Sequence, residues 1–396
     1  MTPTGPGRGS SGSLRFVVLL GVVSLFADMT YEGARAVTGP FLAALGAGAT
    51  AVGVVAGLGE LAGYALRLAS GYLSDRTRRH WPFVLLGYGL NVLAVPLLAL
   101  AGRWETAAVL MIVERLGKGV RTPPRDVLLS HAAAEMGRGW AFGLHEALDQ
   151  IGAVTGPLLV AAILYWRASY RLGFGVLVAP ALLTLVCLLV ARALYPEPER
   201  FEAAGSAAAG RFPRVFWVYV ASVACLGLGF ADFALIAFHL KKVSVVTDSW
   251  IPVLYALAMA VDGLAALALG KLFDRWGLPL LIGVPVLSCL FAPLAFSRSA
   301  AAVVAGTVLW GVGMGAQESV VRAAIAVLVP VERRGTAYGV FNAVYGVAWF
   351  AGSALMGALY DVSIPYLAAF SVLSQVLAVP LLGAVRRELR SASRRA

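Results

Sequence analysis

Two carboxylates lie one helical turn apart in the first apolar stretch of the chain. Asp28, Glu32 and Arg35 are spaced at i, i+4 and i+7, so they share one face of a helix. Two ionised carboxylates this close in an apolar segment repel each other, and one of them is expected to hold a proton, with Arg35 biasing which one ionises. A group that gains and loses a proton can carry it. We therefore predict that Asp28, Glu32 and Asp149 couple protons to a transported cargo.

The same helical spacing of polar residues recurs in other apolar stretches. Glu60, Tyr64 and Arg67 repeat it, as do Glu114 and Lys118. An ionisable group at mid-membrane costs roughly a few kcal/mol, so such residues normally face a water-lined cavity or a partner. The predicted substrate-binding residues are Arg35, Glu60, Tyr64, Arg67, Asn91, Glu114, Lys118, Arg121, His145, Asp232, Asn342 and Tyr345.

Some of these charges have a purely structural alternative. Glu60 and Arg67 could compensate each other in packing. Near the cytoplasmic end, Arg115, Arg125 and Asp126 could form salt bridges between helices or snorkel to the interface. The second half of the chain is poorer in charge, and its aromatic residues could contact a cargo or fill the core. A charged first half opposite a more apolar second half would suit an amphipathic cargo.

The composition places these residues in a membrane protein. Of 396 residues, 60% are hydrophobic and 13% charged, against roughly 45–50% and 25% in soluble domains. The net charge of +11 would suggest nucleic acid for a soluble chain, but here we expect no nucleic-acid partner, because basic loops are a membrane topology signal. The partners we expect are the lipid bilayer and a small molecule. Three cysteines in apolar runs suggest neither a disulfide framework nor a metal cluster.

Twelve helical spans can be read between the polar breaks. A span needs roughly 20 apolar residues. The predicted spans are 15–43, 50–73, 82–101, 107–129, 140–164, 173–194, 215–239, 250–272, 279–297, 300–329, 336–360 and 365–385. The predicted organisation is a disordered cytoplasmic tail at 1–14, a six-helix bundle at 15–195, a cytoplasmic linker at 196–214, a second six-helix bundle at 215–385 and a basic cytoplasmic tail at 386–396.

Two loops of the chain carry related sequences. Gly71, Asp75 and Arg76 lie in Gly-Tyr-Leu-Ser-Asp-Arg after the second span. Gly270, Asp274 and Arg275 lie in Gly-Lys-Leu-Phe-Asp-Arg after the eighth. Paired repeats indicate two pseudo-symmetric bundles that open a site alternately to each side of the membrane. We predict that these six residues form gating loops, in which Asp75 makes charge-assisted contacts.

These motifs resemble those of the major facilitator superfamily. Arg115-Leu-Gly-Lys-Gly119 is similar to the family's Arg-x-x-x-Gly motif, and Gly152-x-x-x-Gly156-Pro157 is similar to its antiporter-associated glycine–proline motif. The resemblance implies an all-α fold of 12 transmembrane helices and transport by alternating access, in a multi-pass protein of the cell membrane. It names no cargo.

The leading functional hypothesis is proton-coupled export of a small amphipathic or organic compound, in which cargo binding releases a proton. Metal-ion efflux is an alternative, prompted by Asp28, Glu32, His145, Asp149 and His239, and a membrane sensor is a third. The chain has no Gly-x-x-x-x-Gly-Lys-Ser/Thr and no His-Glu-x-x-His, so ATP-driven pumping and zinc proteolysis lack their motifs. We expect no catalytic residues, no cofactor other than the proton, no bound metal, and a monomer.

The distribution of Lys and Arg predicts that both termini and the linker are cytoplasmic, because basic residues stay on that side. A single cysteine placed at Ser206, in a background without native cysteines, should react with an impermeant thiol reagent only after cells are permeabilised. Labelling of intact cells from outside would contradict this topology.

Overall fold

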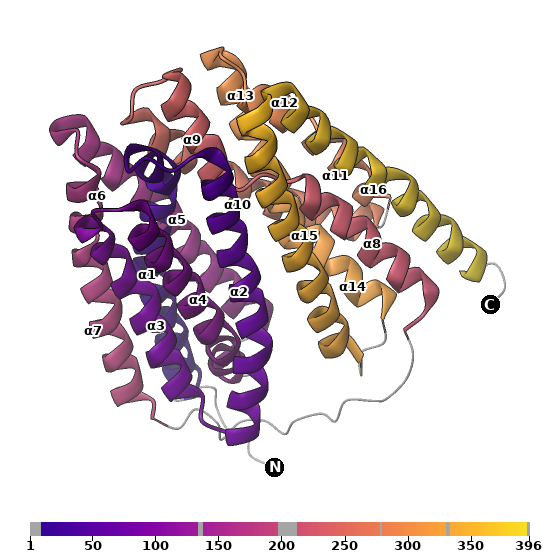
Figure 1. Ribbon diagram of the computed structural model, residues 1–396. Helices are drawn as coiled ribbons and strands as arrows, with labels where there is room; N and C mark the ends of the chain where they lie inside the picture. Colours follow the sequence, from indigo (N-terminus) through magenta and orange to yellow (C-terminus); the bar gives the residue numbers. More distant parts are fainter. Residues whose placement is uncertain (1–8, 134–137, 197–211, 278, 330–332, 394–396) are drawn as a thin grey trace. The chain divides into compact units, whose positions relative to one another are not determined.

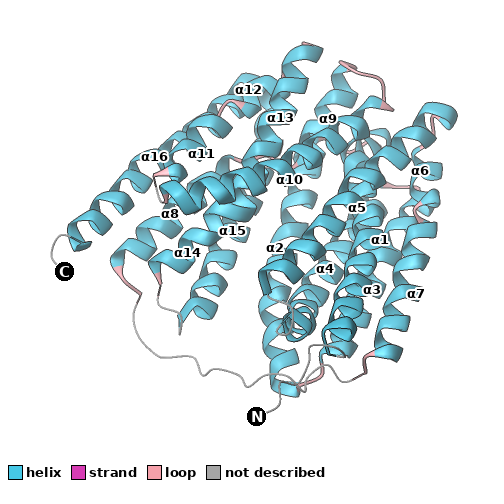
Figure 2. Ribbon diagram, turned by 180° about the vertical axis from the view of Figure 1, so that it is seen from behind, coloured by secondary structure: helices cyan, strands magenta, loops and turns pink. Residues whose placement is uncertain are grey.

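The computed structural model describes residues 9–133, 138–196, 212–277, 279–329 and 333–393. Within these ranges the chain is helical, with short connections and no strand (Figure 2). The all-α fold class predicted from the sequence is confirmed.

The described residues of the first half form seven α-helices, which are labelled in Figure 1. They are α1 (Gly9–Ala44), α2 (Ala49–Thr77), α3 (His80–Leu97), α4 (Trp104–Ala133), α5 (Arg138–Arg167), α6 (Tyr170–Val176) and α7 (Val178–Leu194). A single 3₁₀ turn, Leu98–Leu100, extends α3.

The described residues of the second half form nine further α-helices and one π-helical turn. The helices are α8 (Arg214–Gly229), α9 (Phe233–Val243), α10 (Trp250–Trp276), α11 (Leu280–Ser288), α12 (Phe291–Ala295), α13 (Ala300–Ala316), α14 (Arg322–Leu328), α15 (Arg334–Val362) and α16 (Ile364–Ser393). The π-helical turn, Gln317–Val321, joins α13 to α14.

Every predicted span has a helical counterpart among the described residues. Ten helical stretches are long and apolar enough to cross a membrane, and Leu280–Ala295 is a shorter apolar one. The remaining stretch, α4, has 30 residues but carries a row of charged side chains. The predicted set of twelve spans therefore agrees with the helices, and α4 is the span whose charges most need partners.

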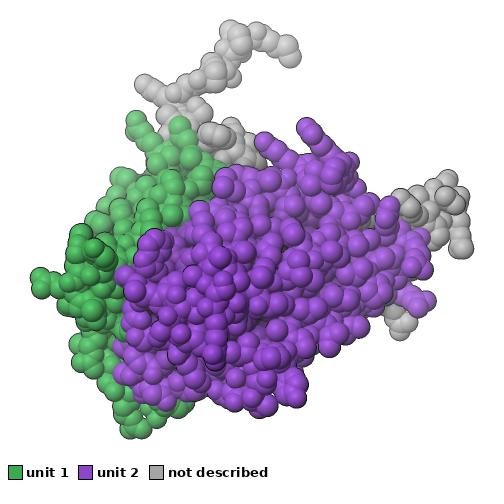
Figure 3. All heavy atoms as spheres, turned by 90° about the horizontal axis from the view of Figure 1, so that it is seen from above, with its two compact units in different colours: residues 1–34, 65–204 green, residues 35–64, 205–396 purple. Residues whose placement is uncertain are grey.

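The chain forms two compact units, coloured separately in Figure 3. Unit 1 comprises residues 1–34 and 65–204, and unit 2 comprises residues 35–64 and 205–396. Helices α1 and α2 therefore contribute residues to both units. Much of the predicted linker and parts of both predicted tails lie outside the described residues, but α1 already begins at Gly9 and α16 continues to Ser393.

In unit 1, helix α5 packs closely on α1 through two glycines. A Cβ atom added at Gly152 would lie 2.2 Å from the Leu25 carbonyl oxygen, and one at Gly156 would lie 2.2 Å from that of Met29. Any larger side chain would therefore push the helices apart. This glycine pair therefore allows α5 to lie against the turn of α1 that carries Asp28.

In unit 2, the seventh predicted span is interrupted. Residues 230–232 are not helical, and they separate α8 from α9. The Trp310 indole donates to the Ala231 carbonyl over 2.9 Å, and the Ser371 hydroxyl donates to the Gly229 carbonyl over 2.6 Å. The Asp232 carboxylate caps α9 by accepting from the Ala234 amide. Side chains thus satisfy the polar backbone groups that the interruption exposes.

Candidate functional site

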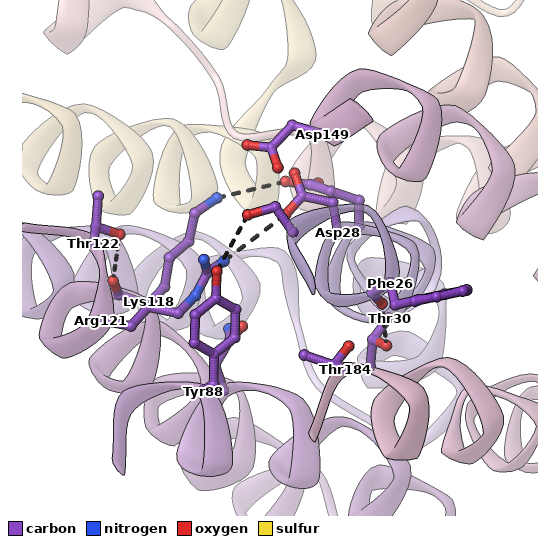
Figure 4. Close-up of polar contacts among 12 residues, drawn as sticks. Phe26, Asp28, Thr30, Tyr88, Lys118, Arg121, Thr122, Asp149 and Thr184 are labelled. Carbon is purple, nitrogen blue, oxygen red and sulfur yellow. Dashed lines mark hydrogen bonds and ion pairs between the residues drawn. The ribbon is translucent and has the colours of Figure 1, made fainter. Parts of the chain in front are cut away.

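Charged side chains of α1 and α4 form ion pairs inside unit 1 (Figure 4). Asp28 Oδ1 lies 3.8 Å from Arg121 Nη2, and Glu32 Oε1 lies 3.7 Å from Lys118 Nζ. Both carboxylates are largely buried. The spacing of the charges places successive pairs one turn apart on each helix, so the two polar stripes predicted from the sequence contact each other.

Arg121 has an unusual environment within this group. Its side chain is only 1% exposed, and its guanidinium lies 4.3 Å from the Tyr88 ring centroid and 5.5 Å from that of Tyr31. The two rings stabilise the cation through cation–π contacts. The two aromatic rings therefore position the guanidinium, while the donors on Nε and Nη1 make no hydrogen bond with a described residue.

Helix α5 adds a second carboxylate beside Asp28, as Figure 4 shows for Asp149. Asp149 Oδ2 lies 3.9 Å from Arg125 Nη1 and 3.8 Å from His145 Nδ1. The other ring nitrogen of His145 lies 2.9 Å from the Ser24 hydroxyl. The three predicted proton-coupling residues, Asp28, Glu32 and Asp149, thus lie in one charged cluster of unit 1.

The alternative predicted for Arg125 and Asp126 has partial support. Arg125 donates to Asp126 Oδ1 from Nε over 3.0 Å and from Nη2 over 2.8 Å. Because these residues are adjacent on α4, this contact is local, and it is the pairing of Arg125 with Asp149 that bridges helices.

Asn91 and Glu114 form a separate buried contact between α3 and α4. The Asn91 amide donates to Glu114 Oε1 over 2.7 Å, and Arg115 Nε lies 3.4 Å from the other carboxylate oxygen. Asn91 also donates to the backbone carbonyl of Glu114. These contacts satisfy polar groups within the helix pair.

In unit 2, Arg35 is shared by two carboxylates. Its Nη2 atom donates to Glu60 Oε1 over 2.9 Å and to Asp232 Oδ2 over 3.0 Å. The side chains are 11%, 15% and 3% exposed for Arg35, Glu60 and Asp232, so this is a buried triad. One cation therefore links α1, α2 and the interruption before α9.

Predicted binding residues also meet on α2 and α15. The rings of Tyr64 and Tyr345 pack edge to face at 5.8 Å, and the Tyr345 hydroxyl donates to Gln317 Oε1 over 2.6 Å. Asn342 and Arg67 are half-buried on α15 and α2.

The predicted gating residues lie at the ends of helices. Gly71, Asp75 and Arg76 belong to the last turns of α2, and Gly270, Asp274 and Arg275 belong to those of α10. Both aspartates are exposed, and neither forms an ion pair with a described residue. Their role in gating stays a prediction.

Several contacting residues were not among the predicted set. Tyr31 and Tyr88 flank Arg121, Ser24 contacts His145, and Gln317 contacts Tyr345. Ser24 lies one turn before Asp28, so the helical period would have found it. In the sequence, Tyr31 and Tyr88 look like the other aromatic residues of the predicted spans, and no spacing distinguishes them from those.

The metal-efflux alternative has little geometric basis. In the described part of the chain, no group of three or more His, Cys, Asp or Glu residues is arranged to hold a metal ion. Both ring nitrogens of His239 lie within hydrogen-bonding distance of oxygens, those of the Tyr360 hydroxyl and the Ser297 carbonyl.

Comparisons with known proteins agree on one family. A family model described as Major Facilitator Superfamily matches residues 19–353 and 236–394. An uncharacterized protein of Mycobacterium tuberculosis is 45% identical over 390 residues, covering 96% of this chain and 95% of that protein. An uncharacterized MFS-type transporter of Methanocaldococcus jannaschii is 26% identical over 356 residues, covering 88% of this chain and 89% of that one.

A solved transporter structure shares the fold. The nucleoside transporter NupG, solved as a point variant, aligns with a TM-score of 0.74 and 11% identity. The alignment covers 94% of this chain and 99% of that one.

The buried triad predicts a large loss of stability when its cation is removed. Replacing Arg35 by Met leaves Glu60 and Asp232 as buried carboxylates without that partner, and should lower the free energy of unfolding by roughly 3–5 kcal/mol. Reversible unfolding in mixed micelles would measure the change.

The matched control is Arg103→Met. Arg103 pairs with Glu105 at 3.1 Å, but it is 79% exposed. Replacing Arg103 should lower the free energy of unfolding by about 0–1 kcal/mol. Equal losses for the two variants would show that the triad does not stabilise unit 2.

Proposed function

The chain belongs to the major facilitator superfamily, and we propose that it is a proton-coupled secondary transporter that exports a small amphipathic organic compound. Family membership supports a multi-pass membrane transporter that is not an enzyme. The coupling ion, the cargo and the direction are our proposals, as are the cytoplasmic termini.

The observation that carries proton coupling is the looseness of the ion pair between Asp28 and Arg121. Asp28 Oδ1 lies 3.8 Å from Arg121 Nη2, which is longer than a hydrogen bond, and no described residue makes a hydrogen bond with Asp28 Oδ1. A carboxylate in a short, bidentate pair is strongly held in its charged form. The Asp28 carboxylate loses less stabilisation when it takes a proton, so it is suited to exchange protons.

Protonation of this carboxylate changes the charge balance inside the membrane. A neutral Asp28 leaves the buried Arg121 guanidinium without its carboxylate neighbour, which is costly in an apolar environment. The cluster must respond by admitting a counter-charge or by moving. Both responses link proton binding to a change in cargo affinity or in helix position.

Coupling between helix movement and proton binding is supported by the packing of α5 on α1. The glycine–proline motif resembles one associated with antiporters, and its two glycines bring α5 against the turn of α1 that carries Asp28. A shift of α5 relative to α1 would therefore change the distances between the charged side chains of the proton-coupling cluster. The sign of the coupling depends on the charge of the cargo.

Neutralising the α1 carboxylates should uncouple transport from the proton gradient. A thermal-shift screen of amphipathic organic ions on purified protein would first identify a transported compound. In proteoliposomes with an imposed pH gradient, Asp28→Asn and Glu32→Gln should each abolish accumulation of that compound but preserve its exchange across a membrane without a gradient.

The matched control is Glu105→Gln, which neutralises an exposed carboxylate at the start of α4. This variant should accumulate the compound like the wild type. If both α1 variants still concentrate cargo at the wild-type rate, the coupling site lies elsewhere.

A further inference from the structure

The unused donors of Arg121 point to a ligand. A guanidinium has five N–H donors, and those on Nε and Nη1 are buried without a hydrogen bond to any described residue. The remaining contact, with Asp28, is 3.8 Å long. Buried donors normally have partners, and arginine pairs most strongly with planar or tetrahedral oxyanions through two parallel bonds.

We propose that Arg121 binds an anionic group of the cargo, such as a carboxylate or sulfonate, in competition with Asp28. This inference rests on the proposed transport function and names the chemistry of its substrate. The Tyr31 and Tyr88 rings flank the guanidinium and would contact the apolar body next to the anionic group. The cargo is then an amphipathic organic anion.

The charged groups around Arg121 indicate which carboxylate an incoming anion would displace. The titratable and charged side chains that face this cluster are Asp28, Tyr31 and Glu32 on α1, Tyr88 on α3, Lys118 and Arg125 on α4, and His145 and Asp149 on α5. Glu32 and Asp149 have Lys118 and Arg125 as cationic neighbours. Asp28 is therefore the carboxylate that an incoming anion displaces.

This competition determines the sign of the coupling. When an anion occupies Arg121, Asp28 loses its cationic neighbour and takes up a proton more readily. Anion and proton then favour each other's binding, and they cross the membrane together. An exported acid would leave with its proton, down its own gradient. This differs from exchange, in which a cationic cargo and a proton compete for the carboxylate.

Two probes of similar size and opposite fixed charge separate these alternatives. Benzenesulfonate is a permanent anion, and phenyltrimethylammonium is a permanent cation. Binding is measured by isothermal titration calorimetry in phosphatidylcholine nanodiscs, so that no anionic lipid supplies the same chemistry.

Asp28→Asn should bind benzenesulfonate several-fold more tightly than the wild type, because the resident competitor is neutral. The double variant with Arg121→Met should lose this binding, and it removes both charges of the pair, so neither is left buried alone. Arg103→Met, in an exposed pair, should leave the affinity unchanged. Phenyltrimethylammonium should not gain affinity in Asp28→Asn.

Three results would overturn the assignment. They are no measurable benzenesulfonate binding to Asp28→Asn, equal benzenesulfonate affinity with and without Arg121, and tighter wild-type binding of phenyltrimethylammonium that is lost in Asp28→Asn.

The outcome is separable from that of the proposed function. If benzenesulfonate binds through Arg121 but its flux in proteoliposomes ignores a pH gradient, proton coupling fails and the anion site stands. If Asp28→Asn abolishes coupled flux while benzenesulfonate binding ignores Arg121, the anion site fails and proton coupling stands.

Discussion

A charge inside a membrane-spanning helix needs another charge or polar group close to it, and this constraint organises the charged clusters described above. Asp28 and Glu32 on α1 face Arg121 and Lys118 on α4, and Asp149 on α5 faces Arg125. Each contact joins two helices that are separate in sequence. The low dielectric of the membrane makes the removal of one partner of such a pair expensive.

Close helix packing brings these charges within reach. Gly152 and Gly156 allow the α5 backbone to touch α1 on the turns around Asp28. In unit 2 the charges are brought together by the non-helical residues before α9, which direct Asp232 toward Arg35. Among the described residues, the pairs that join α1 to α4 in unit 1 are long, whereas the contacts of Arg35 in unit 2 are short and shared by two carboxylates. Loose pairs can exchange a proton or a ligand, and short ones hold structure.

The helical period was sufficient to predict which residues share a face, but not which faces meet. It placed Asp28 and Glu32 together and put Lys118 and Arg121 on one stripe of α4. It also placed Arg35 beside the α1 carboxylates, as a bias on their ionisation. In the structure, Arg35 donates to Glu60 and Asp232, two partners that the helical period of α1 by itself does not reveal.

Other features leave no mark in the sequence pattern. The interruption at 230–232 lies in a predicted span, and donors that are distant in sequence, among them Trp310 and Ser371, satisfy its backbone carbonyls. Tyr31 and Tyr88 look like any aromatic residue of a span until Arg121 lies between them. Which ion pairs are long and which are short depends on helix spacing, and a single sequence does not contain it.

We propose that an anion binds to Arg121 and that Asp28, which then loses this ion-pair partner, takes up a proton. Infrared difference spectroscopy on the purified protein, with and without benzenesulfonate, detects the carbonyl stretch of a protonated carboxylic acid directly. We expect one such band to appear when benzenesulfonate binds to the wild-type protein and to be missing in Asp28→Asn. A band that disappears on binding, or one that persists unchanged in the variant, would contradict it.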